Sequence, residues 1–109
     1  MANAELGQPV EWIEDFTPPP LDALLEARRR QRYGSFEGHA EVTQDLKRTV
    51  NGHLARRAKE LSDVQREALE MICHKIGRII NGDPNYDDSW VDIAGYATRV
   101  VEHLRGEPT

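Results

Sequence analysis

The segment from Ser62 to Gly82 constrains the fold more than any other part of the chain. Ser62 and Gln65 have the spacing of a capping box, in which each side chain accepts a hydrogen bond from the other residue's backbone amide. Apolar residues then recur every three or four positions, at Val64, Ala68, Leu69, Ile72, Ile76, Ile79 and Ile80. Asn81 and Gly82 are typical of the left-handed residue that ends many helices. The segment therefore predicts an amphipathic helix over 63–80.

Three further segments predict helices by the same spacing. One begins at Leu21, after a proline triplet, and runs to about Arg32. The apolar stripe of the next comprises Phe36, Ala40, Thr43, Leu46, Val50 and Leu54. The stripe of the last, capped by Asp87 or Asp88, comprises Trp90, Ile93, Ala94, Ala97, Val100, Val101 and Leu104. Since no segment sustains the period-two alternation of a strand, the fold is predicted to be all-α.

The length of the chain allows one domain, which we expect to be a compact four-helix domain over 21–106. Its last two helices are joined by a short loop and should form an antiparallel hairpin, with Ile76 and Trp90 in the core. Gly77 and Gly95 lack bulk, which would let the two backbones approach closely.

Residues 1–20 lack helical periodicity and end in three prolines, which favour an extended chain. All charged residues of this Pro-rich segment are acidic. Trp12 and Phe16 are too apolar to leave in water, so we expect this arm to dock on a neighbouring subunit of a homo-oligomer.

The charge balance excludes some classes of partner. A net charge of −5 opposes binding to long nucleic acids, which depends on neutralising phosphates. No apolar run is long enough to span a membrane, and the single Cys73 cannot form an internal disulfide. We therefore expect a cytoplasmic protein with no membrane association.

The turn RYGSFEGH is the first candidate binding site. Its glycines free the backbone, and Ser35 stands at a helix N-terminus, where anions bind readily. Arg32 and Tyr33 add a charge and a stacking surface, which suits a nucleotide, and His39 lies one turn into the helix. The alternative is a simple helix-to-helix turn with Tyr33 and Phe36 packed in the core.

Two rows of polar residues form the second candidate site. They comprise Glu67, Glu70, His74, Lys75 and Arg78 on the third predicted helix, and Asp88, Asp92, Tyr96, Arg99 and His103 on the fourth. An antiparallel hairpin would let the rows meet, whereas the alternative is two solvated faces with intrahelical ion pairs. Glu67, Glu70, Asp88 and Asp92 would suit Mg²⁺, which takes oxygen ligands.

Three segments together, RYGSFEGHA, ALEMICHKIGRIINGDPNY and DSWVDIAGYA, resemble a family of small tailed-phage and prophage proteins of unassigned function. The likeness covers roughly residues 30–104. It implies an all-α protein in the cytoplasm of an infected or lysogenic bacterial cell, and it supplies no activity.

A more distant likeness is to the all-α nucleotide pyrophosphohydrolases of the MazG type, which carry ExxE and ExxD carboxylate pairs around Mg²⁺. Glu67 and Glu70 match the first pair. The second pair departs from the pattern, because Ser89 stands three residues before Asp92 and the nearest acid is Asp88. This departure argues against hydrolysis while leaving the helical scaffold and a polar groove in place.

We therefore expect binding, without turnover, of a nucleotide or a nucleotide-derived defence signal, with no catalytic residue, metal or cofactor. Small helical phage proteins that sequester such signals are an analogy of class and charge rather than a motif match. A Mg²⁺-dependent pyrophosphohydrolase and a protein-interaction module are the alternatives. The expected ligand-binding residues are Arg32, Tyr33, Ser35, His39, His74, Lys75, Arg78, Tyr86, Asp92 and Tyr96.

Overall fold

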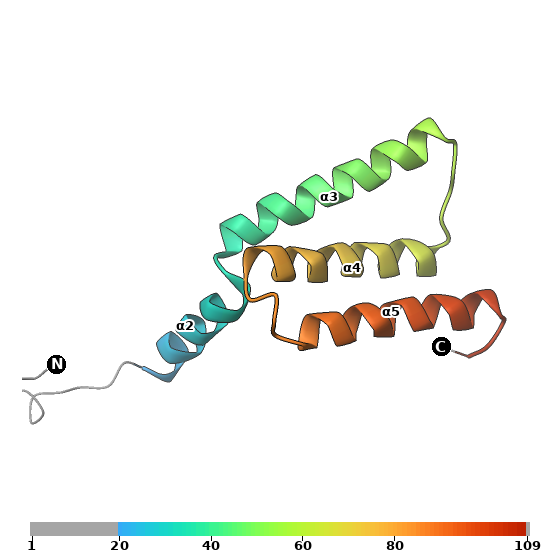
Figure 1. The fold of residues 1–109 in the computed structure, drawn as a ribbon. Helices are drawn as coiled ribbons and strands as arrows, with labels where there is room; N and C mark the ends of the chain where they lie inside the picture. The colour runs from blue at the N-terminus through green and yellow to red at the C-terminus, as the bar shows by residue number, and fades with distance from the viewer. Residues whose placement is uncertain (1–19, 109) are drawn as a thin grey trace, which may run out of the picture.

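Helices make up the fold in the computed structural model, which describes residues 20–108 and contains no strand among them (Figure 1). The helices are α2 (Leu21–Tyr33), α3 (Phe36–Arg56), α4 (Asp63–Asn81) and α5 (Asp88–Leu104). The prediction of an all-α fold is confirmed. The predicted arm, with Trp12 and Phe16, lies outside the described residues except for Pro20.

Serine caps start two of the helices. Gln65 N donates to Ser62 Oγ at 3.2 Å and Ser62 N donates to Gln65 Oε1 at 2.9 Å, so the predicted capping box of α4 is complete. Ser35 caps α3 by accepting from Gly38 N at 3.1 Å. Each cap satisfies a backbone amide that the first turn leaves without a partner.

Two helix ends differ in detail from the prediction. Gly82 has a φ of −124°, so it is not left-handed. Glycine is needed there because a Cβ would lie 2.0 Å from the carbonyl oxygen of Arg32, where the end of α4 meets the end of α2. At the start of α5, Asp87 occupies the N-cap as one of the two predicted candidates, but its side chain makes no capping hydrogen bond, and Asp88 is the first helical residue.

The helices α3, α4 and α5 lie side by side with α4 in the middle, and α2 projects from one end and touches α4 (Figure 1). Gly77 of α4 faces Thr43 of α3, whereas Lys75 reaches Asp92 of α5. Residues two apart lie about 200° apart on a helix, so α4 is covered on opposite sides. Gly77 therefore serves the α3–α4 contact and not the predicted α4–α5 contact.

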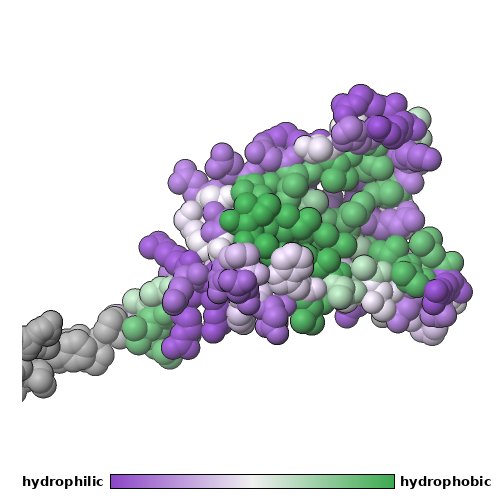
Figure 2. All heavy atoms as spheres, in the orientation of Figure 1, coloured by the Kyte–Doolittle hydropathy of each residue, from purple (hydrophilic) through white to green (hydrophobic). Residues whose placement is uncertain are grey.

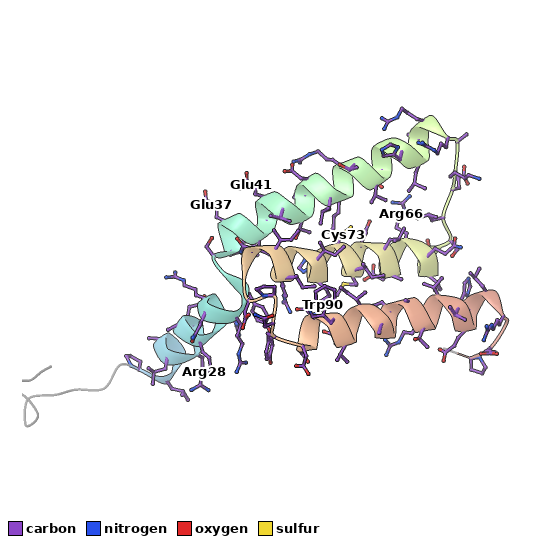
Figure 3. All side chains as sticks on the ribbon, viewed as in Figure 1. Arg28, Glu37, Glu41, Arg66, Cys73 and Trp90 are labelled. Carbon is purple, nitrogen blue, oxygen red and sulfur yellow. The ribbon has the colours of Figure 1, made fainter. Side chains whose placement is uncertain are left out.

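Little apolar surface is buried by this single layer of helices. The buried apolar residues are Ala68 and Cys73, and no large side chain in the described part is fully buried. Trp90 was predicted in the core but is 54% exposed at the start of α5, where its indole Nε1 donates to the Pro84 carbonyl at 2.9 Å (Figure 3). Ile76 is only half-buried. Apolar residues instead gather on one face of the layer (Figure 2).

None of the four described helices has the length and apolar composition that crossing a membrane requires.

Candidate functional site

The candidate site is a groove of about 300 Å³ where α2 turns into α3 beside the C-terminal half of α4. We call it the α2–α3 groove. Five of the ten predicted ligand-binding residues line it, namely Tyr33, Ser35, His39, His74 and Arg78. Its other lining residues are Glu26, Arg29, Gly34 and Phe36. A groove of this size falls at the lower end of the range for small-molecule sites.

Asn81 does not line the groove but fixes its shape by tying the turn between α2 and α3 to the end of α4. Its Nδ2 donates to the carbonyl oxygens of Tyr33 and Ser35, both at 2.8 Å. The approach is so close that a Cβ on Gly34 would lie 2.2 Å from the Asn81 carbonyl oxygen, and Gly34 also has a φ of +76°. Asn81 was predicted only as part of a helix end, and a hydrogen bond to a segment about 50 residues away leaves no local signal in the sequence.

Cations and aromatic rings alternate beside the groove. The Arg78 guanidinium lies 4.5 Å from the centroid of the Tyr33 ring, and that of Arg32 lies 4.7 Å from the Tyr86 ring. The two tyrosine rings meet edge to face at 6.3 Å. These four predicted residues come together from α2, α4 and the loop before α5. Stacking uses the guanidinium faces and leaves N–H groups at the edges that can donate to an anion.

Two histidines form the floor. His39 Nε2 lies 3.2 Å from His74 Nδ1, and the buried His39 Nδ1 has no hydrogen-bond partner. We assign the shared proton to His39 Nε2, because the other tautomer would leave an unpartnered N–H buried at Nδ1. His74 then carries its own proton on Nε2, the nitrogen that is left to donate to a ligand.

Both histidines are uncharged at neutral pH. Burial lowers the pKa of His39 below 6.5, and His74, Arg78, Lys47 and Lys75 lower it further by charge repulsion. Burial is also the main cause that lowers the pKa of His74, followed by Lys47, Arg78 and Lys75. The positive charge of the groove therefore comes from its arginines, and the histidines offer neutral hydrogen bonds.

Phe36 provides an apolar surface at the groove. The sequence analysis placed it on the buried stripe of α3, but its side chain is 82% exposed. The face of the Tyr33 ring is covered by Arg78, so Phe36 has the more accessible ring of the two. Phe36 is also the first residue of α3, where the helix N-terminus favours anions.

The remaining predicted residues lie elsewhere. Lys75 forms an ion pair with Asp92 at 2.9 Å across the α4–α5 contact, and Tyr96 lies in a separate hollow with Glu67 and Arg99. The two polar rows therefore meet, as the sequence analysis expected, but their meeting place is distinct from the α2–α3 groove.

The four carboxylates proposed for Mg²⁺ do not gather within one chain. Since Lys75 pairs with Asp92, Glu67 lies eight residues, or about 12 Å, further along α4 from that point. Glu70 is 3.9 Å from Arg66 on the side toward α3. Among residues 20–108, no three His, Cys, Asp or Glu side chains lie close enough together to hold a metal ion.

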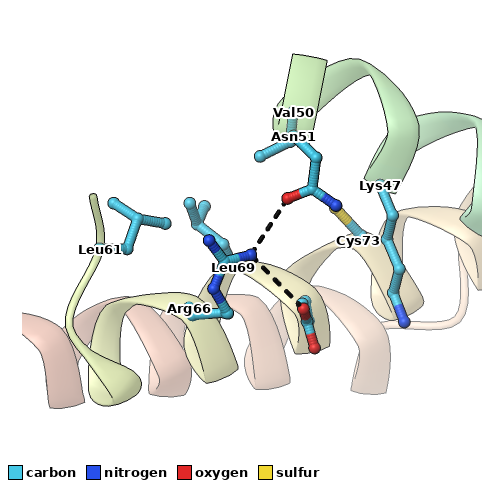
Figure 4. Close-up of a pocket in the computed structure, with 8 residues that line it drawn as sticks. Lys47, Val50, Asn51, Leu61, Arg66, Leu69 and Cys73 are labelled. Atoms are coloured by element: carbon cyan, nitrogen blue, oxygen red, sulfur yellow. Dashed lines mark hydrogen bonds and ion pairs between the residues drawn. The ribbon is translucent and has the colours of Figure 1, made fainter. Parts of the chain in front are cut away.

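A smaller cavity between α3 and α4 is a packing gap (Figure 4). Its volume is about 10 Å³, and Arg66 crosses it to donate to Asn51 Oδ1 at 3.1 Å. Burial raises the pKa of Cys73, which lines the cavity, so this thiol stays protonated. The cavity has room for at most one water.

A family model described as a domain of unknown function (DUF6378) matches residues 21–103. No curated protein and no solved structure matched the chain.

Proposed function

We propose a function from the α2–α3 groove, because the chain belongs to the DUF6378 family, whose description names no activity. In this proposal the groove binds a nucleotide or nucleotide-derived signal without turnover. The observation that carries the proposal is that Arg29, Arg78 and His74 converge in one groove with the exposed ring of Phe36. Charged donors beside an open aromatic ring suit a ligand with a phosphate at one end and a base at the other.

Each part of the ligand has a partner in this proposal. The edge of Arg78 donates to the phosphate together with Arg29, and His74 Nε2 adds a neutral donor. Arg29 lies 3.8 Å from Glu26 in the structure. The base stacks on Phe36, and the α3 N-terminus reinforces the preference for an anion. A four-helix scaffold with an α4–α5 hairpin holds these groups in place. Holding the ligand without turnover would sequester it, which is the role we infer, with a host-defence signal as the target.

The test is a thermal-shift screen of the full chain against mono-, di- and cyclic nucleotides. A ligand at one hundred times its dissociation constant should stabilise the fold by about 2.7 kcal/mol, or more than about 10 °C for a domain of this size. The nucleotide should be recovered unchanged afterwards. A screen without any shift would refute the proposal.

Variants then locate the site. Phe36→Ala should reduce the shift at little cost to the unliganded protein, because the side chain is almost fully exposed. Val91→Ala removes another exposed apolar side chain, far along the chain on α5, and should leave the shift unchanged. Arg78→Ala should abolish the shift. Equal shifts for all three variants would place the ligand elsewhere.

The same incubations discriminate the enzyme alternative. Pyrophosphate release that requires Mg²⁺ and is lost in Glu67→Gln would favour a nucleotide pyrophosphohydrolase over a binding protein. A chain that ignores nucleotides altogether would favour the protein-interaction alternative.

A further inference from the structure

The layer of α3, α4 and α5 has one apolar face on which no other part of residues 20–108 packs. On α4, Leu69, Ile76 and Ile80 lie between the α3 contact and the α5 contact. They lie about 60–100° from Gly77 on the α3 side and about 100–140° from Lys75 on the α5 side. Leu69 also lines the small cavity between α3 and α4. On α5, Trp90, Val101 and Leu104 follow a stripe at helical spacing that is turned away from α4. All of these except the half-buried Ile76 are exposed.

The two stripes belong to the same face of the layer. Residues two positions apart lie on roughly opposite sides of a helix. Glu67 therefore lies opposite Leu69 on α4, and Arg99 lies opposite Val101 on α5. Glu67 and Arg99 line one hollow together, which puts them on one face. Leu69 and Val101 therefore share the other face. We call these six residues the apolar face.

A single layer of helices leaves the fold without an ordinary core. Domains bury apolar faces between two packed layers, but here no large side chain in residues 20–108 is fully buried. A second layer that covers the apolar face is therefore needed whenever the chain folds. Another copy of the same chain meets this requirement, and so does the N-terminal arm; sedimentation separates the two.

The chemistry and size of the face also suit a second copy. None of its six residues is charged, so two such faces can meet without opposing like charges, although the chain carries a net charge of −5. The 19 residues of α4 are about 28 Å long, and two helices about 9 Å apart give a face of roughly 500 Å² on each copy. The two copies together would then bury about 1,000 Å², which is about the least that a specific interface needs.

We propose that this chain forms a symmetric dimer in which the apolar faces of two copies pack against each other. This interface differs from the arm-mediated contact that the sequence suggested, and it does not depend on the function proposed for the groove.

Sedimentation of the full chain tests the proposal. The expected mass is twice 12.4 kDa. Val101→Glu should raise the dissociation constant at least about tenfold, because it places a charge inside the interface. Val91→Glu is the matched control, because it makes the same change on the same helix. The Val91 side chain is 61% exposed and that of Val101 is 42% exposed. The two side chains point about 80° apart around α5.

A full chain that stays monomeric at the highest soluble concentration would overturn the proposal. A monomer is also the result expected if the chain's own N-terminal arm covers the apolar face. Equal dissociation constants for Val91→Glu and Val101→Glu would overturn it too. Circular dichroism checks that both variants keep their helices. If Val101→Glu loses them, the pair Val101→Ala and Val91→Ala replaces it, and only the first should weaken the dimer.

Discussion

Gly77 is the position where the packing of α4 against α3 is most sensitive to a single added methyl group. A Cβ there would lie 2.5 Å from Thr43 Oγ1 and 3.1 Å from His39 Nδ1. Neither neighbour can move cheaply, because both are buried and Thr43 is β-branched and restricted at χ1. Gly77→Ala should therefore overpack the contact, at a cost of about 1 to 3 kcal/mol.

Gly95 provides the control for this change. It also lies inside a helix, but a Cβ there would meet only the end of the Arg99 side chain, at 3.7 Å. Replacing a helical glycine by alanine raises the free energy of unfolding by about 0.5 to 1 kcal/mol, and this applies to both substitutions. Gly95→Ala should stabilise by that amount, and Gly77→Ala should be about 1 to 3 kcal/mol less stable than Gly95→Ala.

Urea unfolding at one fixed protein concentration measures the difference, since concentration affects the stability of any oligomer. In thermal unfolding the melting temperature of Gly77→Ala should lie at least about 4 °C below that of Gly95→Ala. If Gly77→Ala stabilised the chain as much as Gly95→Ala does, the argument that α3 and α4 meet closely at Gly77 would be refuted.

Three further predictions follow from particular contacts. Trp90→Phe should cost about 0.5 to 1.5 kcal/mol, because it removes the hydrogen bond to the Pro84 carbonyl; an unchanged urea midpoint would contradict this. Stability should fall as the pH drops below about 6.5, because His39 takes up a proton at its ordinary pKa when unfolded but at a lower pKa when folded. His39→Gln should make the stability fall less steeply at low pH. The same pH dependence of stability in the variant and the unmodified chain would contradict this role of His39. If the N-terminal arm docks on a subunit, Trp12→Ser with Phe16→Ser in the full chain should lower the sedimenting mass; an unchanged mass would leave the apolar face as the interface.

The sequence alone determined that residues 20–108 form four helices and roughly where each one lies, although it described the end of α4 and the capping hydrogen bond of α5 incorrectly. Helix formation depends on local features, such as the capping box at Ser62, the cap at Ser35 and the three-to-four spacing of apolar residues, and these act within a few residues of one another. The same local chemistry identified the turn at Tyr33 and Ser35 as a candidate site, and the structure places both residues in the α2–α3 groove.

Only the tertiary structure decided which sides of the helices face one another. Apolar residues cover more than one side of α5, so periodicity could not tell that Trp90 stays exposed while Ser89 is buried. Likewise, Tyr33 and Arg78 meet because Asn81 ties segments about 50 residues apart, a contact that leaves no periodic signal. Spacing along a chain records local geometry, whereas these choices depend on the shape and hydrogen bonding of distant segments.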